Sequence, residues 1–316
     1  MQVELSAEQR LIRETVAAIA RENFAAGAAQ ADEQLAGRLA NDNIGDRIFE
    51  VLTLFTLRLG MSRGPLKVRL ANASPLDAGR QLIQTYAGCL GLLGPDRRFR
   101  PVEAGTSVAE AILRSLGGSL HPSALEAIDA LLIVLADHEL TSSTFAARVA
   151  ASAGATLHGC VTAALATASG PEIGRLYDRV EDFLKPPIDP DTLYAAARSV
   201  LTHGQTPPGF NHPMYQKGDP RAELLLELAS SLVRGKSKEA ANLQHFLVRA
   251  RQKMHLHPRV ELGAVALCRA LQLPQGSPSA LFAIGRTAGT VAHVIEQRSA
   301  GFLLRPRARF LSSSGP

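Results

Sequence analysis

Histidines and arginines in separated segments of the chain are the residues that could do chemistry. They are His138, His212, Arg221, Arg286 and Arg305, and most of them stand next to predicted helix ends or loops. An arginine binds a carboxylate through two parallel hydrogen bonds. If these five side chains converged in space, they would suit a ligand that carries two or three carboxylates.

Each of these residues also has a plainer explanation, and the sequence alone does not show that they converge. A single histidine after a helix is more often a hydrogen-bonded structural residue than a ligand. Asp219-Pro220-Arg221 is also typical of a helix start, with proline at the first helical position. Arg286 is harder to explain, because it interrupts an apolar segment. A buried guanidinium is costly unless an anion pairs with it.

The composition indicates a globular protein with a core of aliphatic side chains. Hydrophobic residues make up 46% of the chain and charged residues 20%, whereas aromatic residues make up 5% and Trp is absent. Leu, Ala, Val and Ile must therefore fill the core. The net charge of +5 is modest, and the one dense basic stretch is 305–309. This charge distribution argues against a nucleic-acid partner.

Cysteine usage and the apolar runs indicate where the protein works. Cys89, Cys160 and Cys268 lie in apolar, helix-like sequence without a CxxC pair, which predicts reduced thiols in a cytoplasmic protein and no metal site. The N-terminus lacks the apolar core of a signal peptide. The longest apolar run, 130–136, is too short to span a membrane.

Hydrophobic periodicity predicts an all-α fold. Leu125, Ile128, Leu131 and Leu135 follow the spacing of a buried helical face. No segment alternates apolar and polar residues for long enough to predict a strand. Small residues crowd 146–170, which predicts central helices that pack closely.

Helix caps and proline-rich breaks predict how the helices are grouped. Ser107 is predicted to cap one helix and Asp191 another that runs to about residue 200. Breaks are predicted at 185–190, 206–209 and 274–278, where prolines stop helices. We expect a large helical domain formed by 1–170 plus 275–316, and a small helical domain formed by 171–274.

Four long segments of the chain resemble the citrate synthase and 2-methylcitrate synthase family. They are ADHELTSSTFAARVAASAGA (136–155), PPGFNHPMYQKGDPRA (207–222), FAIGRTAGTVAHVIEQ (282–297) and LLRPRARF (303–310), in the family's order. The resemblance runs from about residue 74 to 310, and 1–73 show no clear match. It implies a citrate-synthase-like, all-α fold with a cleft between a large and a small domain.

The resemblance implies a role for each polar residue. His138 would hydrogen-bond an oxaloacetate-like substrate, and His212 would bind its keto oxygen and act as the acid. Arg221 and Arg286 would bind carboxylates. Arg305 would reach the site of the neighbouring subunit, which implies a dimer.

The same resemblance implies that a CoA thioester is a substrate and that no cofactor is bound. The loop formed by Pro208, Gly209, Phe210 and Asn211 would receive the CoA adenine.

The sequence departs from the family pattern at two catalytic positions, so the chain resembles a family member with a divergent active site. Ile173 stands where the family has the histidine that stabilises the enol of acetyl-CoA, and its side chain cannot hydrogen-bond. Glu261 stands where the family has the aspartate that removes the methyl proton. A glycine is also replaced by Arg175, which is expected to bring charge near the thioester.

Two functions therefore stay open from the sequence. The first is a citrate-synthase-type condensation of an acyl-CoA with a dicarboxylate 2-oxo acid, with His212 and Glu261 as catalytic groups. The alternative is a non-catalytic ligand-binding protein, or a partner subunit in a hetero-oligomeric citrate synthase. The partner would be a second copy of the chain or a citrate synthase paralogue. Neither function involves nucleic acid or a membrane.

Overall fold

The computed structural model describes residues 34–37, 39, 44–62, 74–185, 187–233 and 237–307. Within these ranges the regular secondary structure is helical, and the β-type pairing consists of one isolated antiparallel bridge between Phe210 and Pro258. The predicted all-α fold is confirmed. The elements are η1 (Gly45–Arg47), α3 (Ile48–Ser62), α5 (Pro75–Cys89), η2 (Leu90–Leu92), α6 (Val108–Leu116), α7 (Pro122–Leu135), α8 (Ser142–Ser152), α9 (Leu157–Ala168), α10 (Leu176–Phe183), α11 (Pro190–Thr202), α12 (Pro220–Val233), α13 (Lys238–Met254), α14 (Val260–Ala270) and α15 (Ser277–Ala300).

Side-chain caps set most of the helix starts. Ser107 accepts the N–H of Glu110 at 3.2 Å, as predicted, and Gly117 ends α6 with a φ of 76°. The predicted cap at Asp191 is wrong. Asp189 accepts the N–H of Thr192 at 2.8 Å, so α11 begins two residues earlier, at Pro190. An aspartate directly before a proline at the first helical position is the stronger start signal.

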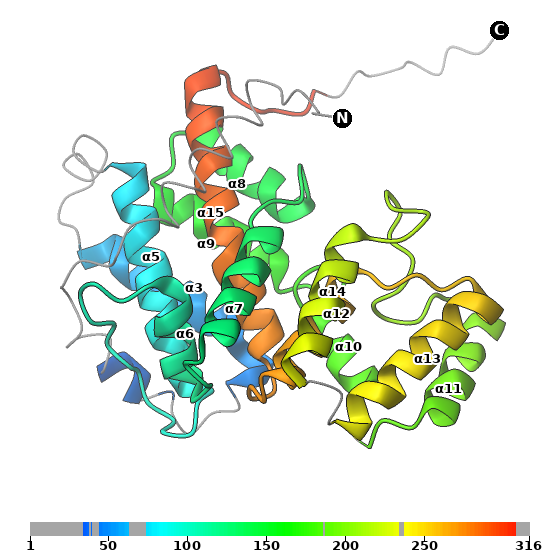
Figure 1. The fold of residues 1–316 in the computed structure, drawn as a ribbon. Coiled ribbons are helices and arrows are strands. Elements are labelled where there is room, and N and C mark those ends of the chain that lie inside the picture. The colour runs from blue at the N-terminus through cyan, green and yellow to red at the C-terminus, as the bar shows by residue number, and fades with distance from the viewer. Residues whose placement is uncertain are drawn as a thin grey trace, which may run out of the picture.

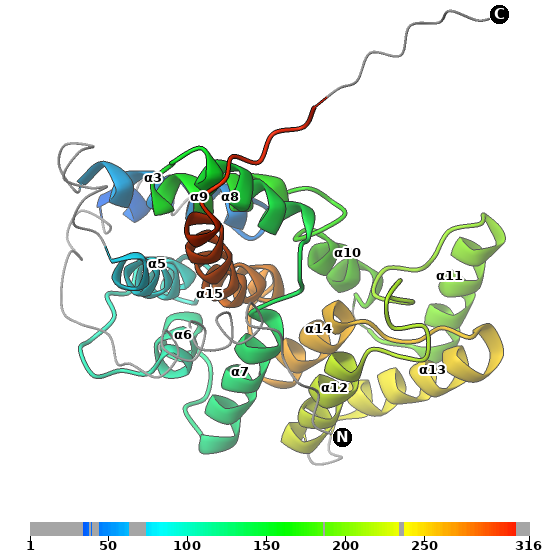
Figure 2. The ribbon, with the colours of Figure 1, turned by 90° about the horizontal axis from the view of Figure 1, so that it is seen from above.

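Helix α15 is the central element of the fold. It packs against α5, α7, α8 and α9, and Figure 2 shows it nearly end-on between α5–α7 and α8–α9. Its residues from Ser277 to Val294 are all buried. Two glycines let it approach the end of α7. A Cβ on Gly289 would lie 2.0 Å from the Ala136 carbonyl oxygen, and one on Gly285 would lie 3.0 Å from Leu135 Cβ.

A polar network joins α15 to α8 and to the residue after α7. Arg148 of α8 forms an ion pair with Glu296 and donates to His293 Nδ1 at 3.2 Å. His293 in turn donates through Nε2 to Asp137 at 3.1 Å. These largely buried groups satisfy one another, so the network fixes Asp137 and with it the chain that follows α7.

Helices α10 to α14 gather beside the helices that surround α15, as Figure 1 shows. Within this group α12 packs on α14 and α11 on α13. Helix α10 is joined to the start of α15, because Glu181 accepts the N–H of Gly276 at 3.0 Å and Ser279 hydrogen-bonds Asp178. The division into 1–170 plus 275–316 and 171–274 stays a prediction, and parts of the first unit lie outside the described residues.

The close approach at Gly289 predicts a large effect of one added methyl group. Gly289→Ala should lower the free energy of unfolding by about 1–3 kcal/mol or more, because the Ala136 carbonyl it meets is backbone. Gly159→Ala in α9 is the matched control, since its Cβ would meet the nearest atom at an ordinary 3.5 Å. It should be neutral or stabilise by about 0.5–1 kcal/mol. Urea unfolding measures both, and equal effects would contradict this packing.

The contact between Glu181 and the start of α15 predicts a pH dependence of stability. Burial raises the pKa of Glu181 from 4.5 to about 7; the Gly276 N–H opposes the rise and the Asp178 carboxylate adds to it. The folded chain therefore holds this proton more tightly than the unfolded chain, and the free energy of unfolding falls as pH rises from 4.5 to about 7.

Glu181→Gln should remove this part of the slope while its amide oxygen still accepts from Gly276. The free energy of unfolding, measured with urea at pH 5 and at pH 8, should fall less between these values in the variant than in the parent protein. Glu126→Gln, at an exposed position of α7, is the control. Parallel pH profiles for the parent protein and Glu181→Gln would contradict the prediction.

Candidate active site

The 207–212 loop is held against the start of α14. Gly209 has a φ of 79°, and its carbonyl accepts the N–H of Arg259 at 2.8 Å. Asn211 donates its N–H to the His257 carbonyl at 2.8 Å, and its side-chain oxygen accepts the N–H of His257 at 2.8 Å. These bonds keep the next residue, His212, close to the first turn of α14.

His212 is half-buried at the end of this loop, and its hydrogen bonding defines which ring nitrogen carries the proton. Nδ1 accepts the N–H of Met214 at 3.2 Å. Burial lowers the pKa of His212, and the positive charges of Arg259 and Arg221 lower it further. The ring is therefore neutral at neutral pH with its proton on Nε2, which can donate a hydrogen bond to a ligand.

Asp219 fixes the position of Arg221. Its carboxylate, in a residue only 1% exposed, accepts from Arg221 Nε at 2.9 Å and from Nη2 at 2.8 Å. It also accepts the N–H of Val260 at 3.0 Å, which ties the start of α12 to the start of α14. The guanidinium lies over the ring of Tyr215, 5.1 Å from its centroid. Arg221 is therefore preorganised, with Nη1 left to bind a ligand.

Glu261 lies in the first turn of α14 and is 6% exposed. Arg259 donates to both of its carboxylate oxygens, from Nε at 3.1 Å and from Nη2 at 2.9 Å. Each carboxylate oxygen has a second lone pair, so the ion pair orients Glu261 without occupying every acceptor position.

His138 follows the end of α7 and is kept neutral. Its Nε2 donates to the carbonyl of Val134 at 3.3 Å. Burial holds its pKa well below the ordinary value, and the charges of Arg286 and Arg221 act in the same direction. Nδ1 is therefore the free acceptor of this ring.

Arg286 lies in the middle of α15 and is only 4% exposed. Its Nε donates to the Leu135 carbonyl at 3.2 Å, but Nη1 and Nη2 are buried without a hydrogen-bond partner. Burial lowers the pKa of Arg286 to about 10, although the charge of Asp137 opposes this shift. The guanidinium is thus still charged at neutral pH, with two unpaired NH₂ groups, an arrangement suited to binding a carboxylate.

The structure brings together most of the residues predicted to form the site. The charges of Arg286 and Arg221, and His212, lower the pKa of His138. The carboxylate of Glu261 acts to raise the pKa of His212. Electrostatic coupling of this kind requires these side chains to lie near one another. The cluster is formed by the residues after α7, the starts of α12 and α14, the middle of α15 and the 207–212 loop.

Arg305 lies apart from this cluster in the same chain. From Arg286 to the end of α15 the helix rises about 20 Å. The chain then continues along α8, where the Leu304 N–H donates to the Ser152 hydroxyl at 3.0 Å. Arg305 itself is exposed.

The 170–175 turn leads into α10, and its side chains differ from the expectation in one respect. Ile173 is half-buried and packs against the edge of the hydrophobic core. The guanidinium of Arg175 points to η1 and α3 instead of the His212 cluster. It donates to the Asp46 carbonyl at 2.5 Å and to Glu50 at 2.8 Å. The expectation that Arg175 places its charge in the site is therefore wrong.

Three residues of the cluster were missed from the sequence. Asp219 forms an ion pair that orients Arg221, and Arg259 forms one that orients Glu261. In each pair the opposite charge stands two residues earlier in the sequence, which is the signal that could have revealed it. Tyr177, in the first turn of α10, interacts electrostatically with Glu261 and with Arg286. An isolated tyrosine in an amphipathic helix gave no comparable signal.

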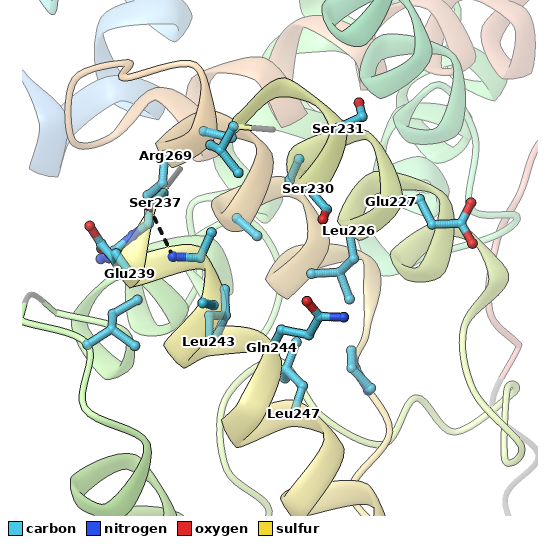
Figure 3. Close-up of a pocket in the computed structure, with 18 of the residues that line it drawn as sticks. Leu226, Glu227, Ser230, Ser231, Ser237, Glu239, Leu243, Gln244, Leu247 and Arg269 are labelled. Atoms are coloured by element: carbon cyan, nitrogen blue, oxygen red, sulfur yellow. Dashed lines mark hydrogen bonds and ion pairs between the residues drawn. The ribbon is translucent and has the colours of Figure 1, made fainter. Parts of the chain in front are cut away.

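A separate cavity of about 870 Å³ lies between α12, α13 and α14 (Figure 3). Leu226, Leu243 and Leu247 line it together with Gln244 and the Glu239–Arg269 ion pair. Neither the histidines nor Arg221, Glu261 and Arg286 are among its lining residues.

The described ranges contain neither a metal-binding cluster nor a membrane-spanning helix. No group of three or more His, Cys, Asp or Glu side chains there is placed to hold a metal ion. Among the helices of those ranges, none combines the length and the apolar character needed to cross a membrane.

Comparison with known sequences identifies the family. The family model described as "Citrate synthase, C-terminal domain" matches residues 81–307. Citrate synthase 2 of Bacillus subtilis is 31% identical over 242 residues, which cover 73% of this chain and 64% of that protein. The 2-methylcitrate synthase of Shewanella oneidensis is 27% identical, over 61% of this chain and 52% of that protein. The chain belongs to the citrate synthase family, and it spans less than two thirds of the length of these relatives.

Solved structures share the fold. The citrate synthase of Thermoplasma acidophilum, in a ternary complex with carboxymethyl coenzyme A and oxaloacetate, superimposes with a TM-score of 0.73 at 21% identity, and the match covers 100% of this chain and 84% of that chain. The citrate synthase of Pyrobaculum aerophilum gives a TM-score of 0.72 at 20% identity, covering 99% and 80%. The helical architecture is therefore that of citrate synthases.

Arg286 is buried without a partner for its NH₂ groups, whereas the partly buried Arg148 is ion-paired, and the two should therefore differ in their effect on stability. Arg286→Met should change the free energy of unfolding by less than about 1 kcal/mol, because it removes a charge whose NH₂ groups have no partner. Arg148→Met should lower it by on the order of 3 kcal/mol, because it leaves Glu296 unpaired in a largely buried network. Urea unfolding of both variants measures the difference. A loss at Arg286 as large as that at Arg148 would mean that Arg286 is structural.

Proposed function

We propose that this protein binds a dicarboxylate 2-oxo acid of the oxaloacetate type together with an acyl-CoA, and condenses them to a citrate-type product. The observation that carries the proposal is the buried guanidinium of Arg286, whose Nη1 and Nη2 lack partners. A charged group of this kind is stabilised when a carboxylate accepts from both nitrogens. Family membership and the presence of oxaloacetate and a CoA analogue in the Thermoplasma complex support the same assignment.

The neighbouring residues suit the other parts of the acceptor. Arg221, fixed by Asp219, would bind a second carboxylate through Nη1. His212 would donate its Nε2 proton toward the keto oxygen, where negative charge develops during attack. His138 would accept a hydrogen bond from the substrate through Nδ1. Two neutral imidazoles between cationic groups can hydrogen-bond the ligand without adding repulsion.

The acyl-CoA would approach from the side of the 207–212 loop and Glu261. The loop formed by Pro208, Gly209, Phe210 and Asn211 would receive the adenine. Glu261 would be the base that removes a proton from the carbon next to the thioester, held in position by Arg259. The CoA thioester is thus a substrate, and the chemistry requires no bound cofactor.

A second candidate is a non-catalytic ligand-binding protein or a partner subunit of a hetero-oligomeric citrate synthase. Ile173 favours it, because this half-buried side chain cannot replace a hydrogen-bonding imidazole. Arg305 is compatible with either function, because its exposed side chain would complete the site of a neighbouring subunit. That neighbour would be a second copy or a citrate synthase paralogue.

One experiment on the purified chain tests the proposal in two parts. Oxaloacetate should raise the midpoint of thermal unfolding of the parent protein, since a ligand at 100 times its Kd adds about 2.7 kcal/mol of stability. Acetyl-CoA or propionyl-CoA with oxaloacetate should then release a free thiol. Arg286→Met should lose the oxaloacetate-induced shift, because the variant lacks the buried guanidinium that binds a carboxylate of oxaloacetate.

Glu261→Gln separates binding from chemistry in the same experiment. It should keep the thermal shift and lose about 10²–10⁴-fold in thiol release, the usual contribution of a general base. Thermal stabilisation without thiol release by the parent protein would support the non-catalytic candidate, and Ile173→His would then be assayed for recovered turnover. No stabilisation by oxaloacetate, citrate or CoA would contradict both candidates for the isolated chain.

A further inference from the structure

Tyr177 carries a buried hydroxyl that no described residue satisfies. The residue is 1% exposed, and its hydroxyl oxygen is buried without a hydrogen-bond partner. Leaving such a group unpaired costs about 1–3 kcal/mol. Native proteins retain few such groups, and each calls for an explanation such as a ligand or a catalytic role.

The other large buried tyrosine shows what a structural hydroxyl looks like in this fold. Tyr86 of α5 is 0% exposed, and its hydroxyl forms a hydrogen bond with Thr56 of α3. Both side chains are therefore sealed from solvent, but only the Tyr86 hydroxyl has found a partner within the protein. The pair provides a matched comparison for experiment.

The surroundings of Tyr177 place its hydroxyl in the candidate active site. Its ring lies against Phe282, with 5.0 Å between ring centroids, and the Arg286 guanidinium lies 5.5 Å from the centroid of that same Phe282 ring. The hydroxyl interacts electrostatically with Glu261, Arg286 and Arg221. These are the residues assigned above to the base and to the two carboxylates of the acceptor.

The charge state of Tyr177 makes it a donor. Burial raises the pKa of Tyr177 well above its ordinary value, and the carboxylate of Glu261 raises it further, whereas Arg286 and Arg221 oppose the shift. The phenol therefore keeps its proton at neutral pH. A protonated phenol with no acceptor in the protein is available to donate to an oxygen atom of a bound ligand.

We propose that the Tyr177 hydroxyl donates a hydrogen bond to the thioester oxygen of the bound acyl-CoA while Glu261 removes the adjacent proton. The inference rests on the proposed function and assigns the group that makes enolisation feasible without a hydrogen-bonding side chain at Ile173. Ile173 lies in the turn that leads into α10, and Tyr177 lies in the first turn of that helix, so the two side chains come from the same short segment of the chain.

The step balances without any further reactant. Glu261 takes the proton as the carbon–hydrogen bond breaks, and the electron pair moves to form a carbon–carbon double bond and a negatively charged thioester oxygen. Tyr177 stabilises that oxygen through its O–H and keeps its proton. The enolate carbon then attacks the keto carbon of the acceptor, whose oxygen receives the proton from His212 Nε2. The proton held by Glu261 returns to His212 through solvent, which restores both groups for the next turnover. Hydrolysis of the new thioester by water releases the CoA thiol.

Tyr177→Phe tests the proposal through both turnover and binding. Thiol release should fall by about 10²–10³ in kcat, the effect of losing one oxyanion donor, with a KM for acyl-CoA that changes little. Carboxymethyl-CoA carries a carboxylate near the position of the enolate oxygen, so its affinity in the presence of oxaloacetate should fall about 10-fold to 100-fold. Calorimetric titration with CoA alone should show no change.

Two further variants exclude a purely structural role. Tyr86→Phe breaks the Thr56 hydrogen bond, so it should lower the unfolding midpoint and leave kcat and carboxymethyl-CoA affinity unchanged. Tyr177→Phe should be at least as stable as the parent protein, because its hydroxyl has no partner to lose. In the double variant Ile173→His and Tyr177→Phe, an imidazole supplies the donor instead, so thiol release should recover in part.

The outcomes separate this inference from the proposed function. Normal kcat and normal carboxymethyl-CoA affinity in Tyr177→Phe would overturn the role of Tyr177 and leave the proposed function standing. If the parent protein binds ligands without turnover, the carboxymethyl-CoA titration still decides, because a selective loss of affinity supports the donor and an unchanged affinity overturns it. If the parent protein binds neither oxaloacetate nor CoA, the proposed function fails and the role of Tyr177 fails with it.

Discussion

The buried guanidinium of Arg286 is the constraint on which the rest of the site depends. Helix α15 carries it into the core, and the close approach at Gly285 and Gly289 holds that helix against the end of α7. The side chain cannot leave for solvent without breaking this packing. Its one hydrogen bond, to the Leu135 carbonyl, leaves both NH₂ groups buried without a hydrogen-bond partner. A fixed and uncompensated positive charge of this kind is stable only if its surroundings are arranged around it.

The neighbouring ionisable groups are arranged in that way. The Arg286 charge acts with burial to keep His138 neutral, and it acts with His293 to keep Asp137 ionised. Arg221 and Glu261 are each held by an oppositely charged residue two positions away, so neither needs to rotate when a ligand binds. The cluster is therefore preorganised, and preorganised dipoles and charges are what stabilise developing negative charge at low cost.

The fold could be predicted from the sequence, because helical periodicity, caps and prolines are local signals. The exact start of α11 was assigned two residues too late, because Asp189 and Asp191 are both residues that cap helices, and the proline after Asp189 is what favours the earlier start. Arg286 was recognisable as unusual because it interrupts an apolar helix. Its unpaired NH₂ groups were not predictable, because they depend on contacts between α7 and α15, which are distant in sequence.

The remaining differences also come from tertiary packing. Arg175 was expected near the thioester, but Glu50 and the Asp46 carbonyl attract its guanidinium to another element. Tyr177 was overlooked because a tyrosine in an amphipathic helix is ordinarily a core residue, and only the absence of a partner for its hydroxyl distinguishes it from Tyr86. Long-range pairing decides both cases, and no spacing rule along the chain contains that information.

A structure of the chain crystallised with oxaloacetate and carboxymethyl-CoA would show whether Arg286 is the group that binds a carboxylate of the acceptor. One oxaloacetate carboxylate should lie within hydrogen-bond distance of both Arg286 Nη1 and Nη2, with the keto oxygen facing His212 Nε2. Oxaloacetate bound elsewhere, for example in the cavity between α12, α13 and α14, with the Arg286 NH₂ groups still unpaired, would contradict this role of Arg286.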